Sequence, residues 1–215
     1  MNPYISFSIA MCLIVLLSLG VTAYLAVMFN RRAKIDLGEA LAPLAELAEG
    51  EVDVEEAVAQ GRYAGHLVEG RVARAGDGPG RVFQTSIVDA AGGTPWERTS
   101  TPIKQGEEPP RVSFSSPDSN LESALAVVWD QMMEPVLQPR ADRYRIDYDP
   151  ASGLLRFQRP MRTRRDIPSQ EAFRRQLDFL VALGPINRRA QGAPDADWTG
   201  GRRAGEARPA AEPGS

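Results

Sequence analysis

The chain has 215 residues but only one cysteine, Cys12, and one histidine, His66. A single cysteine cannot form a disulfide within the chain, so nothing in the cysteine content points to an oxidising compartment. The shortage of both residues excludes cysteine–histidine nucleophile pairs and the usual zinc ligand sets. Phosphate-binding P-loops, dinucleotide-binding glycine motifs and serine nucleophile elbows are also missing. We therefore expect no catalytic residues, no metal site and no cofactor.

Charge is missing from one long stretch, residues 5–29, which is 25 residues long and mostly apolar. A helix of that length extends about 37 Å, which exceeds the ~30 Å hydrocarbon core of a bilayer. The stretch therefore predicts one transmembrane helix. A cleaved signal peptide is the alternative, but no basic residue precedes the stretch and its apolar run is too long. The one candidate cleavage motif, Val21-Thr22-Ala23, lies inside the run rather than after it.

Basic residues flank only one end of this predicted helix. Arg31, Arg32 and Lys34 follow it, whereas the residues before it carry no basic side chain. Lysine and arginine close to a membrane helix mark the cytoplasmic side. The bias predicts a single-pass protein of the inner (plasma) membrane, with the lipid bilayer as its first partner and the carboxyl-terminal part in the cytoplasm.

Small residues recur every fourth position inside the predicted membrane helix, at Ser18, Thr22 and Ala26. Such spacing places them on one face, where they allow two membrane helices to approach closely. They form a candidate helix-packing face. The plainer interpretation is that an apolar helix often carries such a triplet by composition alone.

The segment after the membrane helix is acidic. Net charge over the whole chain is −3, but residues 36–60 contain acids and no base. Leucines at positions 37, 41, 44 and 47 have helical spacing, so residues 30–60 are predicted to be an acidic juxtamembrane helical segment. Pro43 is expected to bend or restart this helix, because proline removes a backbone donor. Residues 52–58 are interpreted as a second short helical turn.

Residues 61–189 are predicted to form a small α+β domain. Hydrophobic alternation, turn residues and helical spacing define its elements in order. These are a strand at 63–73 returning at 82–88, a short edge strand at 96–101, a strand at 112–115, a helix at 120–137, a hairpin of 144–148 with 155–158, and a helix at 171–183 ended by Gly184-Pro185. Two such hairpins with helices favour an antiparallel sheet covered on one face.

The last residues, 190–215, are rich in alanine, glycine and proline. They cannot bury enough apolar surface to offset the entropy of ordering, so a disordered tail is predicted. Trp198 stands alone in this tail as a candidate docking anchor. A tryptophan that occurs in the tail by chance is a slightly better explanation than a docking motif.

Arginines form a dense patch at Arg159, Arg162, Arg164 and Arg165, in a predicted connector outside the regular elements. The simplest interpretation is a solvated face, or a complement to the acidic segment of residues 36–60. Contact with the phosphates of anionic lipids is the functional alternative. Nucleic acid is an unfavoured partner, because few aromatic residues accompany the arginines.

The run Gly61-Arg62-Tyr63-Ala64-Gly65 is followed by Val68 and Val72, and later by Leu154-Leu155-Arg156-Phe157 before a helix at 171–183. This pattern resembles uncharacterised single-pass, membrane-anchored bacterial proteins. In those, a Gly-x-Tyr-x-Gly strand opens a small α+β domain. The resemblance implies a fold and no activity.

Together these features predict a membrane-tethered, non-enzymatic binding or assembly subunit whose partner is another membrane protein or a cytoplasmic protein. One alternative is an envelope-facing scaffold component with the opposite topology. A further alternative is an enzyme that uses only carboxylates and arginines.

Overall fold

The computed structural model describes residues 3–75, 80–89, 92–101, 111–137 and 143–192 of the chain. Within these ranges the chain alternates between helices and strands, as the α+β prediction requires. In order, the elements are α1 (Pro3–Leu47), β1 (Glu51–Asp53), β2 (Val58–Tyr63), β3 (His66–Arg74), β4 (Arg81–Val88), β5 (Trp96–Thr101), β6 (Arg111–Ser115), α2 (Asn120–Leu137), β7 (Tyr144–Asp149), β8 (Leu154–Met161), the 3-10 turn η2 (Arg164–Asp166) and α3 (Gln170–Ala190).

The strands form one antiparallel sheet in the order β1-β2-β3-β4-β8-β7-β5-β6. The two predicted hairpins meet at its centre, because β4 pairs along its whole length with β8. The prediction of β5 as an edge strand is wrong, since it lies between β6 and β7. Trp96 explains this position: its buried ring packs against Phe114 of β6 and Tyr148 of β7. An aromatic side chain of this size is best buried between two strands.

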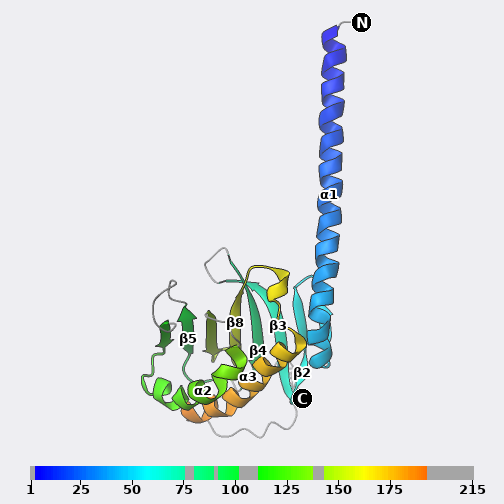
Figure 1. The fold of residues 1–215 in the computed structure, drawn as a ribbon. Coiled ribbons are helices and arrows are strands. Elements are labelled where there is room, and N and C mark those ends of the chain that lie inside the picture. The colour runs from blue at the N-terminus through cyan, green and yellow to red at the C-terminus, as the bar shows by residue number, and fades with distance from the viewer. Residues whose placement is uncertain (1–2, 76–79, 90–91, 102–110, 138–142, 193–215) are drawn as a thin grey trace, which may run out of the picture.

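The helices α2, α3 and the last turns of α1 gather on one side of the sheet (Figure 1). Side chains alternate along each strand, so every second residue faces these helices. In β4, Phe83, Thr85 and Ile87 face inward and are buried. Thr85 Oγ1 donates to Gln176 Oε1 of α3 at 2.6 Å, which satisfies a buried polar pair inside the core.

The helical spacing of apolar residues predicts a buried stripe on α2, from Leu121 to Met132, and another on α3, from Phe173 to Val181. Where side chains are described, both stripes are confirmed. Their buried members, each at most 6 % exposed, are Leu121, Leu125, Val128, Trp129, Phe173, Leu177 and Leu180. Val181 is partly buried against the same core. The side chain of Met132, the last member of the predicted stripe on α2, lies outside the described residues.

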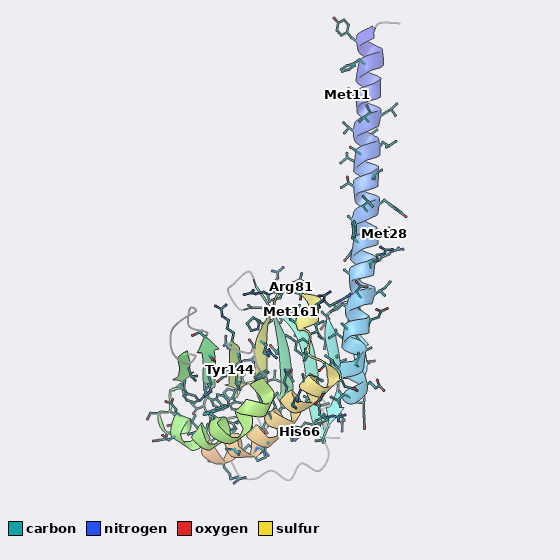
Figure 2. The ribbon with its side chains drawn as sticks, in the orientation of Figure 1. Met11, Met28, His66, Arg81, Tyr144 and Met161 are labelled. Atoms are coloured by element: carbon teal, nitrogen blue, oxygen red, sulfur yellow. The ribbon has the colours of Figure 1, made fainter. Side chains whose placement is uncertain are left out.

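The helix α1 is a single element of 45 residues that joins the apolar stretch to the domain without a break. Its amino-terminal part is long and apolar enough to span a membrane, and it projects away from the domain (Figure 2). Its last turns belong to the core, where Leu41 and Leu44 are fully buried. Pro43 does not interrupt the helix, because the core contacts on either side of it hold the helical backbone in place.

Residues 51–60 differ from the predicted helical segment, because β1 and the start of β2 form a short hairpin there. The turn between them is held by Asp53, whose Oδ1 accepts the amides of Glu55 and Glu56 at 2.8 and 3.1 Å. An aspartate that bonds its own following backbone favours a turn over a helix. The sheet therefore begins at Glu51 rather than at the predicted domain boundary of Gly61.

The Gly-x-Tyr-x-Gly run has a separate structural use for each of its named residues. A side chain at Gly61 would overlap the carbonyl group of Ala48, at the point where Arg62 N donates to Ala48 O at 2.5 Å. Tyr63 donates through its hydroxyl to Asp178 Oδ1 of α3 at 2.7 Å. Gly65 has φ +85° in the two-residue turn that pairs Tyr63 with His66. Positive φ in such a turn suits hairpin twist, so the predicted strand 63–73 begins after a turn.

The predicted end of the last helix at Gly184-Pro185 is wrong, because α3 continues to Ala190. Tertiary contacts beyond the proline favour the longer helix. Asn187 Oδ1 accepts from Trp96 Nε1 at 2.7 Å, and Arg188 forms a buried ion pair with Asp89. Glycine is suited to position 184, where a side chain would crowd Asp89 at 3.1 Å.

Replacing Gly61 by alanine should destabilise the domain by about 1–3 kcal/mol, as overpacking of a tight contact does. The added methyl group must push the end of α1 away from β2. Gly80→Ala is the matched control, since its new methyl would lie 3.6 Å from Ala75 in ordinary contact. Chemical denaturation of the full chain in mild detergent measures the difference. Equal midpoints for the two variants would contradict the close approach.

Candidate functional site

The predicted arginine patch is divided between a strand and an exposed turn. Arg162, Arg164 and Arg165 lie on or beside η2 and are exposed, as expected of a connector. Arg159 lies inside β8 and is half-buried, so the expectation that all four are solvated is wrong for this residue. Burial lowers the pKa of the Arg159 guanidinium from its usual value, and the nearby carboxylate of Asp166 partly opposes this.

Strand ends bring further arginines to the same place. Arg74 ends β3, Arg81 begins β4, and Arg143 directly precedes β7. In an antiparallel sheet these positions share one end with the last residues of β8. We call this the exit end, because the apolar part of α1 leaves the domain there (Figure 2). Sequence reasoning missed these arginines, although each flanks a predicted turn or strand.

The connector after β8 is held by one carboxylate. Asp166 Oδ2 accepts the amides of Arg162 and Thr163 at 2.8 and 2.7 Å, and the Thr163 hydroxyl at 3.2 Å. These bonds hold the pKa of Asp166 below its ordinary value, because they favour the charged form. Asp166 thereby fixes the direction in which the exposed arginines leave the chain.

Acidic residues that follow the apolar stretch of α1 contact part of the exit end. Lys34 Nζ contacts Glu55 Oε1 at 2.5 Å, and Arg164 Nη1 contacts Asp36 Oδ2 at 2.5 Å. The second pair joins the predicted acidic segment directly to the predicted basic patch. Both pairs are about half exposed, so each contributes little to stability and instead ties α1 to its neighbours.

Several arginines of the exit end form no ion pair with a carboxylate of the described residues. The ion pairs between described side chains use a different set of cations, namely Lys34, Arg71, Arg145, Arg156, Arg164, Arg175 and Arg188. The unpaired and exposed arginines are Arg74, Arg81, Arg143, Arg162 and Arg165. The described part of the exit end therefore carries surplus positive charge, even though the whole chain is slightly acidic.

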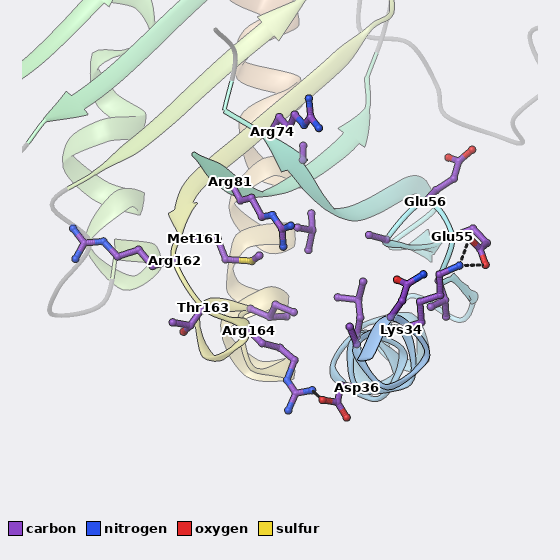
Figure 3. A pocket seen from close by; sticks show the side chains of 18 residues that line it. Lys34, Asp36, Glu55, Glu56, Arg74, Arg81, Met161, Arg162, Thr163 and Arg164 are labelled. Carbon is purple, nitrogen blue, oxygen red and sulfur yellow. Dashed lines mark hydrogen bonds and ion pairs between the residues drawn. The ribbon is translucent and has the colours of Figure 1, made fainter. Parts of the chain in front are cut away.

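A hollow of about 690 Å³ opens at this end, between α1 and the sheet (Figure 3). We call it the exit hollow. Its walls are residues 30–37 of α1, the turn at 54–57, the ends of β3 and β4, and residues 161–167. Arg81 points into it beside Met161, whereas Arg162 points away. The hollow combines cationic groups with an apolar lining, which suits an amphiphilic anion.

The opposite end of the domain is a packed polar cluster. The Asp89–Arg188 pair is almost fully buried, and Tyr148 donates through its hydroxyl to Gly92 O at 2.7 Å. Gln191 contacts both backbone groups of Thr94 at 2.8 Å. These contacts fasten the loop before β5 to the end of α3. His66 also lies at this end (Figure 2), with Nδ1 3.4 Å from Val88 O.

Within the described ranges, no group of three histidine, cysteine, aspartate or glutamate side chains is placed to hold a metal ion. The candidate packing face on α1 is exposed along its length. The hydroxyl groups of Ser18 and Thr22 donate to backbone carbonyls of their own helix at 2.8 Å. These two donors are therefore satisfied within the helix and make the face less polar. Trp198, the candidate docking anchor, lies outside the described residues.

Comparisons with protein-family models, with curated proteins and with solved structures found no match for this chain. The resemblance to membrane-anchored bacterial proteins stays a prediction from the pattern of residues.

Replacing Asp166 by alanine should cost about 1 kcal/mol of stability, as loss of a capping side chain does. Because the folded pKa of Asp166 is lowered, its contribution is present above the usual aspartate pKa and is lost as pH falls through the lowered value. Denaturation at several pH values measures this. The gap between parent and variant should close in acid. Glu171→Ala, which removes another exposed acid, serves as the control. A gap that persists in acid would contradict the role assigned to the carboxylate.

Proposed function

We propose that the chain is a single-pass protein of the inner membrane whose α+β domain is a non-enzymatic binding or assembly subunit in the cytoplasm. The observation that supports this best is the continuity of α1 from its apolar part into the core. Between Phe29, the last residue of the apolar run, and Leu41, the first fully buried residue, the helix extends about 18 Å. A helix of that length acts as a stiff spacer rather than a flexible tether.

Two side contacts add to this stiffness. Lys34 reaches the turn after β1 on one side of α1, and Asp36 reaches η2 on another. The domain therefore keeps one orientation relative to the helix axis. A fixed height and angle above a membrane suit a subunit that presents one surface to a partner embedded in or docked on the same membrane.

The face of the sheet opposite the described helices, here called the uncovered face, is the proposed partner surface. A groove of about 830 Å³ crosses β1 to β4 there, with Leu67, Val88 and Leu154 along its lining. Leu67 is 49 % exposed, which is unusual for a strand leucine in a packed domain. Glu51 and Glu69 lie beside these apolar residues, so the groove fits a segment that is both apolar and basic.

Binding is favoured over catalysis by the state of the buried carboxylates. Asp89 is paired with Arg188 inside the core. Asp147, on the uncovered face, accepts from Arg156 Nε at 2.6 Å and also lies near Arg145. Carboxylates that are paired with arginines in this way stabilise the structure. A general acid or base must instead be placed where it can exchange a proton with a substrate.

The cytoplasmic location rests on Arg31, Arg32 and Lys34, which follow the apolar stretch. A reporter that works only in the cytoplasm, fused after Ser215, should be active. Activity of a reporter that needs the outside of the membrane would overturn this and favour the envelope-facing scaffold. Changing the three cations to glutamine should mix the two orientations, because they are its main determinant. Changing Arg62 and Arg189, which do not flank the apolar stretch in the sequence, should leave orientation unchanged.

The partner surface is tested with a photo-cross-linking residue at Leu67 of the full chain in native membranes. The expected result is one discrete cross-linked species, because the groove should hold a single partner. The same residue at Ser123, exposed on α2 among the covering helices, should give none. No adduct at Leu67 or Val88, or the same adducts at Ser123, would contradict a specific surface.

A further inference from the structure

The exit hollow lies at the height of lipid headgroups, if α1 is anchored as proposed above. Its wall on α1 comprises Asn30, Ala33, Lys34, Asp36 and Leu37. These residues follow the apolar run, so they lie from about 1.5 to 12 Å beyond the hydrocarbon boundary along the helix. The headgroup region of one leaflet is about 5–8 Å thick, since a bilayer of 30 Å core measures 40–45 Å in all. The mouth of the hollow therefore meets the headgroups directly.

The unneutralised charge of the hollow comes from two arginines of neighbouring strands. Lys34 and Arg164 are already paired with Glu55 and Asp36. Arg74 and Arg81 have no carboxylate among the described side chains, and both line the hollow. They are also direct partners in the β3–β4 ladder. Like charges placed directly opposite each other in a sheet are destabilising. An anion bound beside them would reduce that repulsion.

The remaining lining distinguishes a lipid from a small soluble anion. Apolar side chains of Leu37, Val54, Val72, Met161 and Ile167 share the hollow with the arginines. A free phosphate ion has nothing to place against such a surface. A phospholipid offers an anionic phosphate joined to a glycerol and the first methylene groups of its chains, which match both parts of the lining.

We infer that the exit hollow binds the headgroup of an anionic phospholipid, with its phosphate at Arg81, which points into the hollow (Figure 3), and with Arg74 at the rim of the same hollow. Guanidinium groups recognise phosphate through paired hydrogen bonds, which a lysine cannot reproduce. Arg143 and Arg165 lie outside the hollow at the same end, and Arg162, one of its lining residues, points its side chain away from it (Figure 3). These three arginines strengthen attraction to an anionic leaflet. Bound lipid would fix how α1 and the domain, as one rigid unit, are turned relative to the membrane surface, and so the direction in which the uncovered sheet face points.

The test uses the full chain in neutral detergent with equal amounts of phosphatidylglycerol and phosphatidylcholine of identical acyl chains. Native mass spectrometry counts the lipid that each variant retains. The parent should retain phosphatidylglycerol in preference. Each arginine near anionic headgroups is worth about fivefold in binding, so Arg74→Gln with Arg81→Gln should lose about 25-fold. Arg74→Lys with Arg81→Lys should fall between, because it keeps charge without the paired hydrogen bonds.

The matched control, Arg62→Gln with Arg189→Gln, removes the same charge from exposed positions outside the exit hollow. It should bind lipid as the parent does. Equal retention by the Arg74/Arg81 and control variants would overturn the inference, and so would displacement of the lipid by millimolar inorganic phosphate. Thermal unfolding confirms that each variant is folded. Retention in detergent does not depend on membrane orientation, so failure here is distinct from failure of the reporter test.

Discussion

The helix α1 meets two different environments along its length, and the rest of the structure depends on where that change occurs. Up to Phe29 its side chains are apolar and exposed, and from Leu41 its inward side chains are fully buried. The helix remains continuous across this change. Backbone hydrogen bonds within a helix need no partner from solvent or sheet, so one helix can pass from one environment to the other. The end of α1 is therefore part of the domain core, and in the described part of the chain no flexible linker separates the two.

The antiparallel sheet then decides which residues share each end of the domain. Hairpin ends alternate between two ends, so Arg74, Arg81 and Arg143 gather at the exit end with the η2 arginines. Arginine is used differently at the opposite end, where Arg188 is buried against Asp89. A buried pair of this kind often contributes more to specificity of structure than to stability. Here it fastens the loop before β5 to the end of α3.

The two faces of the sheet also divide the chemistry. The covered face carries Trp96 and Phe157, which form one core with helix residues such as Phe173 of α3. The uncovered face carries charged side chains that pair across strands, such as Arg145 with Glu97 at 2.8 Å and Arg156 with Asp147. These pairs keep most of that face polar and flat. The groove near Leu67 departs from this pattern, which is why it is the proposed partner surface.

The sequence by itself determined the features that depend on local pattern. The uncharged run, the α2 stripe from Leu121 to Met132 and the alternation of Tyr144, Ile146 and Tyr148 each predicted the observed element, because period and composition fix a helix or strand locally. The patch at Arg162, Arg164 and Arg165 was found for the same reason. The sequence did not identify Arg74 and Arg81 as part of the same basic surface, because strand pairing between distant segments brings them there.

Only the tertiary structure decided the remainder. It extended α3 past Gly184-Pro185, since the bonds that Trp96 donates to Asn187 and Arg188 donates to Asp89 outweigh the local helix-ending signal. It also made residues 51–60 a hairpin, where the apolar spacing alone fitted a helical turn, because β2 finds a partner strand in β3. The physical reason is the same in each case. Local preference is worth about 1 kcal/mol or less for most residues and about 3 kcal/mol for a proline inside a helix, and burial of several side chains against partners distant in the sequence exceeds it.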